Sequence, residues 1–174
     1  MTRLELYMVL YPIVKLATGV PMTIIANDNH GAPDGSYCSI EPFSGIGERG
    51  QANQSHTANG ALDVNVVIKP QLTVTVSLNF YRDDAKLYAS RLKQCNKRPD
   101  VQALLRAAGI GWNNTSDVRD LTSLQSGLYE QRAQISVTLW YEESFDTITI
   151  NAINEVPLEV QDSNGDILIN SVVN

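Results

Sequence analysis

The sequence is poor in cysteine and histidine, the residues that build disulfide frameworks, metal centres and nucleophilic dyads. Its 174 residues contain two cysteines and two histidines. Cys38 and Cys95 are too few for a disulfide framework and lack C-x-x-C spacing, so we expect two buried free thiols. His30 and His56 lie in polar stretches without an H-x-x-x-H or H-E-x-x-H pattern, and we expect both to be solvated loop residues.

The short motifs of nucleotide and hydrolase chemistry are also absent. The sequence contains no G-x-S-x-G, no G-x-G-x-x-G and no Walker A pattern. A thiol nucleophile at Cys38 or Cys95 is a minor alternative, because no spacing pairs either residue with a base. We therefore expect a protein that is not an enzyme and that has no cofactor.

One stretch near the C-terminus imitates a calcium loop. In "DSNGD", Asp162, Asn164 and Asp166 occupy the first three ligand offsets of an EF-hand. Position 12 of such a loop would be Val173, where an EF-hand has a bidentate glutamate. A hairpin turn at Asn164-Gly165 is the preferred interpretation, and we expect no metal site.

Positive charge and long apolar runs are scarce as well. Thirteen lysines and arginines against nineteen acidic residues give a net charge of -6 and a pI of about 4.8. This balance disfavours stable nucleic-acid binding but is compatible with DNA sliding past an acidic wall. The longest apolar run, residues 6–14, is far shorter than the ~20 residues that span a bilayer, so we expect no membrane contact.

The hydrophobic periods that are present predict an α+β fold. Residues 3–18 have helical spacing before Gly19, with a kink or break expected at Pro12. Alternating apolar residues predict strands, and two central stretches change to a helical period. The expected strands are 22–28, 37–43, 62–68, 71–80 and 133–141, and the expected central helices are 82–97 and 99–108. We predict a mainly antiparallel or mixed β-sheet flanked by the N-terminal helix and the two central helices.

Two segments stand apart from this pattern. Residues 44–60 have no hydrophobic period, which predicts a long polar loop inside a domain of residues 1–143. Glu48 and Arg49, near its start, are candidates for contacting a partner.

Residues 144–174 predict a C-terminal β-hairpin arm, because their apolar side chains have little helical cover nearby in the sequence. We expect the arm to pack on a neighbouring subunit through four of its isoleucines, which are Ile148, Ile150, Ile167 and Ile169.

Four stretches in order resemble the phage neck or tail terminator proteins. They are "LYPIVKLATGV", "VTVSLNFYRDDAKLYASRLK", "LLRAAGIGW" followed by "VRDLTSL", and "EQRAQISVTLWYEE", and they span most of residues 6–143. The resemblance implies a structural virion protein without catalytic residues, assembled in the bacterial host cytoplasm. It implies a homo-oligomeric ring, commonly six-fold, that caps the tail tube.

The same resemblance suggests partners and contact residues. The implied partners are other copies of the chain, an adjacent head-completion or connector protein, and a tail tube or sheath protein, with DNA passing through the lumen. Arg119, Asp120 and Arg132 match recurring polar positions of the family. They could form ion pairs between subunits, or they could form local salt bridges.

A secreted or periplasmic β-rich binding domain is the alternative, with residues 1–19 as a signal peptide. Arg3 precedes the apolar run, and residues 17–19 are small enough to resemble a cleavage site. However, Glu5 interrupts the positive start and Lys15 separates the run from that site. We therefore interpret residues 3–18 as the first helix of the domain.

Overall fold

A computed structural model describes residues 1–29, 31–60, 63–125, 128–151, 156–161 and 167–173. The chain divides into two compact units, the first made of Met1–Gln51 and Pro70–Glu143 and the second of Ala52–Lys69 and Ser144–Asn174. The expected domains divided the chain at residue 143, whereas residues 52–69 group with the chain beyond that point. Strand pairing between distant segments causes this grouping, and local sequence periods do not reveal such pairing.

A six-stranded mixed sheet forms the centre of the first unit. Its main path runs β1-β2-β5-β10-β6, and β7 pairs beside β6 along β10. β1 and β2 are parallel, and all other pairs in this sheet are antiparallel. The strands are β1 (Met22–Ile25), β2 (Tyr37–Glu48), β5 (Gln71–Tyr81), β6 (Ile110–Thr115), β7 (Arg119–Asp120) and β10 (Arg132–Glu142). The predicted α+β class is confirmed.

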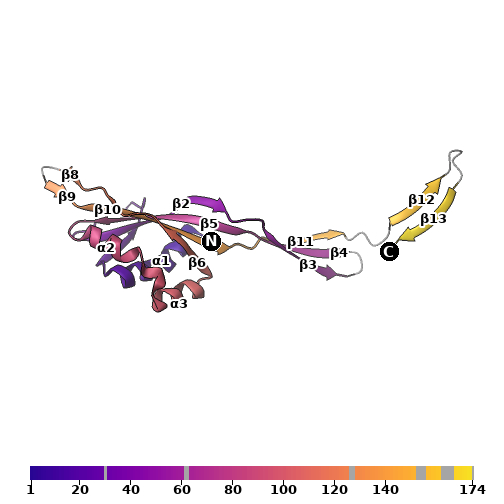
Figure 1. Ribbon diagram of the computed structural model, residues 1–174, viewed down its shortest axis with the longest axis horizontal. Helices are drawn as coiled ribbons and strands as arrows, with labels where there is room; N and C mark the ends of the chain where they lie inside the picture. The colour runs from indigo at the N-terminus through magenta and orange to yellow at the C-terminus, as the bar shows by residue number, and fades with distance from the viewer. Residues whose placement is uncertain (30, 61–62, 126–127, 152–155, 162–166, 174) are drawn as a thin grey trace. The chain divides into compact units, whose positions relative to one another are not determined.

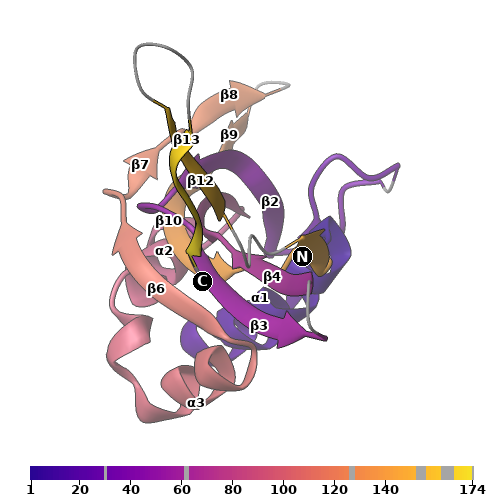
Figure 2. The same cartoon turned by 90° about the vertical axis from the view of Figure 1, so that its right-hand side faces the viewer.

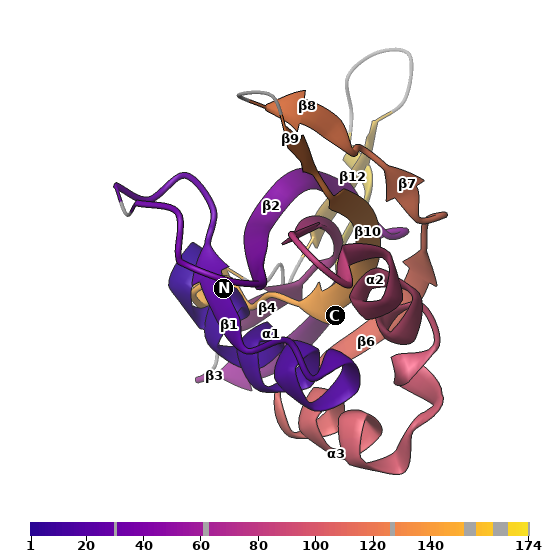
Figure 3. The same ribbon diagram turned by 90° about the vertical axis from the view of Figure 1, so that its left-hand side faces the viewer.

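Three α-helices lie on one side of this sheet (Figures 1 and 3). They are α1 (Arg3–Thr18), α2 (Ala85–Leu92) and α3 (Pro99–Ala107), and a short 3-10 helix, η1 (Cys95–Lys97), precedes α3. α1 begins with a capping box between Thr2 and Glu5 and ends at Gly19, whose positive φ of 76° suits glycine. The predicted N-terminal and central helices are therefore confirmed.

Of the kink or break expected at Pro12, the break is absent, because α1 continues through this residue. Proline lacks the N–H that would bond to Met8, so the helix loses one hydrogen bond. Apolar side chains on both sides of Pro12 are buried, among them Leu10 and Ile13. Their burial favours one continuous helix over two separate pieces.

The core lies between the helices and one face of the sheet. Along β10, alternate residues from Ala133 to Tyr141 are buried, as the period of two predicts. α1 places four fully buried side chains on this face, namely Leu6, Leu10, Ile13 and Val14. The helix is therefore a structural part of the unit, which argues against residues 1–19 being a removable signal peptide.

A short hairpin follows β7 in the same unit. β8 (Ser123–Gln125) and β9 (Leu128–Glu130) lie side by side (Figure 2) and pair antiparallel. In this pairing Leu124 lies opposite Tyr129. The hairpin was not predicted, since each strand is three residues long and too short to show a period.

The second unit contains two small sheets. One has the order β11-β4-β3, with β3 (Asn53–Asn59), β4 (Asp63–Lys69) and β11 (Ile148–Asn151), and both of its pairs are antiparallel. The other pairs β12 (Val156–Gln161) with β13 (Ile167–Val173) antiparallel, as the predicted hairpin requires. The expected turn at Asn164-Gly165 lies outside the described residues.

The prediction of a polar loop over residues 44–60 is wrong. β2 extends to Glu48, and residues 53–59 form β3. Every side chain of β3 is exposed, so the strand has no buried face to create an alternating pattern. Backbone pairing with β4 forms this strand instead, and that pairing leaves no signal in the side chains of β3.

Candidate assembly surfaces

Asp120, one of the predicted contact residues, is paired within its own chain. Its carboxylate lies 2.5 Å from the ammonium of Lys86 on α2. It also accepts hydrogen bonds from the backbone N–H and the hydroxyl of Thr122. The hydrogen bond from Lys86, followed by those from Thr122, lowers the pKa of Asp120 to about 2. The carboxylate is therefore ionised at neutral pH and ties β7 to α2.

Arg132 lies in a row of aromatic and cationic side chains that crosses β2, β5 and β10. The rings of Tyr37 and Tyr81 stack with centroids 4.5 Å apart, and the guanidinium of Arg132 lies 5.1 Å from the centroid of Tyr81. Arg132 also donates a hydrogen bond of 3.0 Å to the side-chain oxygen of Asn79. These contacts fix the side chain on the face of the sheet opposite the helices.

Arg49 is likewise held within the chain, while Glu48 and Arg119 are more open. The guanidinium of Arg49 lies 4.4 Å from the centroid of the Trp140 ring, and its backbone N–H donates to the carbonyl of Gln71. Glu48 and Arg119 are exposed at strand positions on β2 and β7. The structure thus brings Arg119, Asp120 and Arg132 onto neighbouring positions of one sheet, since β7 pairs with the start of β10.

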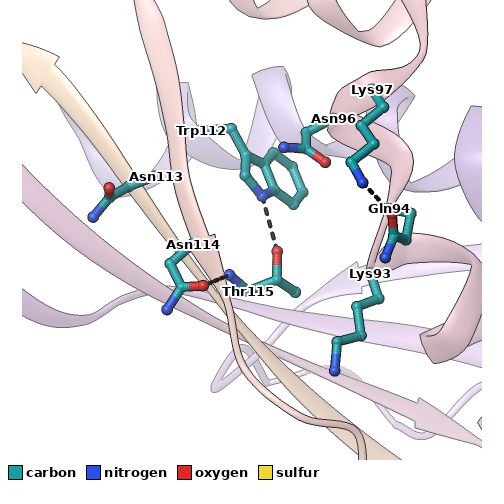
Figure 4. Close-up of a pocket in the computed structure, with 8 residues that line it drawn as sticks. All are labelled: Lys93, Gln94, Asn96, Lys97, Trp112, Asn113, Asn114 and Thr115. Atoms are coloured by element: carbon teal, nitrogen blue, oxygen red, sulfur yellow. Dashed lines mark hydrogen bonds between the residues drawn. The ribbon is translucent and has the colours of Figure 1, made fainter.

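The hollow between η1 and β6 is polar and open (Figure 4). It has a volume of about 200 Å³, and Trp112 forms part of its wall while its indole N–H donates to the hydroxyl of Thr115. Two lysines line the hollow, but Lys93 is paired with Asp117 and Lys97 donates to Gln94. With both cations engaged, the hollow offers little that would hold an anion.

The β8-β9 hairpin is the most exposed apolar feature of the first unit. The side chains of Leu128 and Tyr129 are each 78% exposed, and that of Leu124 is 62% exposed. Leu121, just before β8, is also exposed. Leu124 and Tyr129 are paired and share one face of the hairpin, and Leu128 lies on the other face, so the hairpin exposes large apolar side chains on both faces, which is a feature of protein contacts.

The three-stranded sheet of the second unit has one apolar face. Cross-strand pairing places Ile148 opposite Val66 and Ile150 opposite Val64. Because side chains at paired positions share a face, these four residues form one apolar surface. The isoleucines are 48% and 47% exposed, so Ile148 and Ile150 lie at an incompletely covered edge of the sheet.

The other two predicted arm residues lie on β13. Ile169 is opposite Val160, and Ile167 is opposite Gln161. Their backbone positions agree with a hairpin arm, and their side chains lie outside the described part of the structure.

The thiols and histidines offer no catalytic arrangement among the residues that the structure describes. Cys38 and Cys95 are buried free cysteines, as predicted. Burial raises the pKa of Cys95 to about 12 and that of Cys38 well above its ordinary value, which keeps both thiols protonated. His56 lies exposed on β3, not in a loop, and His30 is outside the described residues.

Metal ligands and membrane spans are likewise absent from the described ranges. No group of three His, Cys, Asp or Glu side chains there could hold a metal ion. The EF-hand-like residues Asp162, Asn164 and Asp166 fall outside those ranges. No helix within them is both long and apolar enough to cross a bilayer.

Sequence reasoning missed the close contacts around Trp140. Gly111 lies directly opposite Trp140, and a side chain at residue 111 would overlap the indole. The glycine in "GIGW" was the available signal, since glycine within a strand often marks a close approach.

Comparison with known families places most of the chain in one family. The model of the family described as phage neck terminator protein matches residues 5–165. A search of curated proteins returns no match. The matched range covers most of the chain, including most of α1, the mixed sheet and the three-stranded sheet of the second unit.

Proposed function

Because the chain belongs to the phage neck terminator family and is a structural neck protein of a phage, we propose that it forms a homo-oligomeric ring of six copies. The ring caps the head-proximal end of the tail tube, and its other side docks on the connector of a filled head. The copies are assembled in the host cytoplasm and remain in the virion. The proposed ring has no catalytic role.

The observation that carries the ring proposal is the exposed apolar surface of the β8-β9 hairpin. Leu128 and Tyr129 are almost four-fifths exposed, and neither contributes to the core. A monomer gains nothing from such side chains, whereas a contact with a second copy would remove them from water. A ring needs two different surfaces that meet around an axis, and a protruding hairpin supplies one of them.

The remaining candidates fit polar parts of this assembly. Glu48 and Arg119 are exposed and are proposed to contact neighbouring subunits or rings. The side chains of the other three candidates contact residues of their own chain; these are Asp120, Arg132 and Arg49. Their proposed role is to position the surface around them.

The charge of the chain supports the passage of DNA without binding. Each copy carries a net charge of -6. On the sheet face opposite the helices, the middle of β10 presents neutral side chains such as Gln134 and Thr138, and the cation Arg132 at its start is already engaged with Tyr81 and Asn79. Acidic and neutral walls release phosphates that basic walls would retain.

The test is the mass of the purified full chain, measured by native mass spectrometry and supported by negative-stain electron microscopy. We expect rings of six copies with a central opening, and we expect added rings to stop the growth of purified tail tubes. A chain that stays monomeric at micromolar concentration, both alone and with tail tubes, contradicts the proposal.

A further inference from the structure

The three-stranded sheet of the second unit has two open edges. β4 is the central strand, and within the part of the chain that the structure describes no strand pairs with the outer side of β3 or of β11. Unpaired strand edges present rows of free N–H and C=O groups, which readily pair with another chain.

β3 lacks the features that usually protect an edge strand. Its sequence, Asn53–Asn59, contains no lysine, no other charged residue and no proline, and it shows no bulge against β4. Its seven side chains are all exposed. Natural edges are commonly blocked by such charges, prolines or bulges, so this edge is open to pairing.

β11 presents the other edge, and it is apolar. Ile148 and Ile150 lie on the apolar face beside Val66 and Val64, and each is about half exposed. The opposite face is polar: Thr149 donates to the amide oxygen of Asn65, which also accepts from Asn59. The apolar face is formed by β4 and β11, while β3 places His56 and Ala58 on the same side, opposite Val66 and Val64.

The two edges match one another in direction. β3 and β11 are each antiparallel to β4, so they are parallel to each other. When the β3 edge of one copy meets the β11 edge of the next, the sheet continues in parallel pairing with its apolar face on the same side. The same contact can then repeat from copy to copy around an axis and close.

We propose that the β3 edge of one subunit pairs with the β11 edge of the next subunit and so links copies of this chain into a continuous sheet. This inference rests on the proposed ring and names its backbone contact. The occupant is a second copy because both edges are uncharged and parallel. The contact also shields Ile148 and Ile150 from solvent, whereas a β3-to-β3 contact would leave them at an unpaired edge.

Cysteine pairs test this contact directly. Thr57 and Thr149 both lie opposite Asn65 on the polar face, so one strand separates them within a chain. Two strand spacings of about 4.8 Å place their Cα atoms roughly 9.6 Å apart, beyond the ~7 Å limit for a disulfide. A disulfide in the variant Thr57→Cys with Thr149→Cys therefore joins two copies.

Three double-cysteine variants test different alignments of β3 of one copy against β11 of the next. Thr149→Cys is combined in turn with Ser55→Cys, Thr57→Cys and Asn59→Cys, which share the polar face of β3. After mild oxidation of the full chain, we expect at least one pair to give a ladder of covalent oligomers that extends beyond the dimer and ends at six. The parent chain, whose Cys38 and Cys95 are buried, is the matched control and should give no ladder.

The remaining outcomes separate this inference from the ring itself. Unmutated rings with no ladder from any pair overturn the edge contact and leave the ring proposal standing. Dimers from Thr57→Cys alone indicate a β3-to-β3 contact and also overturn the inference. If the chain forms no rings and no pair gives cross-links, both proposals are overturned.

Discussion

Trp140 lies over Gly111, its direct neighbour across β10 and β6, so closely that no side chain fits at residue 111. The guanidinium of Arg49 lies over the same indole, 4.4 Å from the ring centroid. The indole therefore links three strands on the face of the sheet opposite the helices, because Arg49 follows β2 directly.

Replacing Gly111 with alanine should destabilise the fold through this contact. The added methyl group forces the indole or the strand to move, and we expect a loss of about 1–3 kcal/mol in the free energy of unfolding, measured by denaturant titration. Gly45→Ala is the matched control, since a methyl there would meet Thr75 at an ordinary 3.6 Å. In a Trp140→Ala background the loss at residue 111 should largely disappear, and an undiminished loss would refute the explanation.

Much of the first unit can be predicted from its sequence. The alternation in β10 and the helical spacing of α1 identify both elements, because each has one buried face that sorts its side chains. β3 could not be predicted, because its side chains are all exposed and backbone pairing with β4 defines it. The contacts of Asp120 and Arg132 were also out of reach, since Lys86 and Asn79 approach them from other elements only after folding.

The pair between Asp120 and Lys86 should show in a titration. In Lys86→Met we expect the pKa of Asp120 to rise from about 2 towards its ordinary value of 3.8, although the bonds from Thr122 keep it lower. Carboxyl chemical shifts measured by NMR from pH 1.5 to 6 give this value. Lys97→Met is the control, since Lys97 bonds to Gln94 instead. An unchanged pKa in Lys86→Met contradicts the assignment.

The same pair predicts the sign of a pH effect on stability. A carboxyl whose pKa is lower in the folded chain than in the unfolded chain stabilises the fold fully at any pH above its unfolded-chain pKa. This stabilisation fades as the pH falls through the folded-chain pKa. The difference in unfolding free energy between the parent and Lys86→Met should therefore be complete above about pH 5 and be lost as the pH falls below about 2. The pair is exposed, so the difference will be small.

The two thiols should be inert in the folded chain. Cys38 and Cys95 are buried, and burial holds the pKa of Cys95 at about 12. With Ellman's reagent at pH 8 we expect no fast reaction until the chain is denatured, when both thiols react. Ser55→Cys, at an exposed position of β3, is the positive control and should react at once. Fast labelling of the native parent would contradict the burial of these cysteines.

Helix α1 should be essential to stability through its buried face. Leu10 is 2% exposed, and Leu10→Ala should cost about 2–5 kcal/mol in unfolding free energy, because it leaves a cavity beneath the helix. Met8 lies on the same helix with 61% of its side chain exposed, so Met8→Ala should change stability by less than about 0.5 kcal/mol. Equal effects at the two positions would show that the helix does not pack as described.

The β8-β9 hairpin should affect assembly without affecting stability. Leu128 and Tyr129 do not belong to the core, so the variant Leu128→Ser with Tyr129→Ser should unfold at the same temperature as the parent when both are measured at a concentration too low for rings to form. If the hairpin contacts a second copy, the variant loses apolar contact area and its ring population, measured by native mass spectrometry, should fall at least tenfold. Leu87→Ser, which removes an exposed leucine from α2, should leave the rings intact. Rings that survive the double substitution would place the subunit contact elsewhere on the chain.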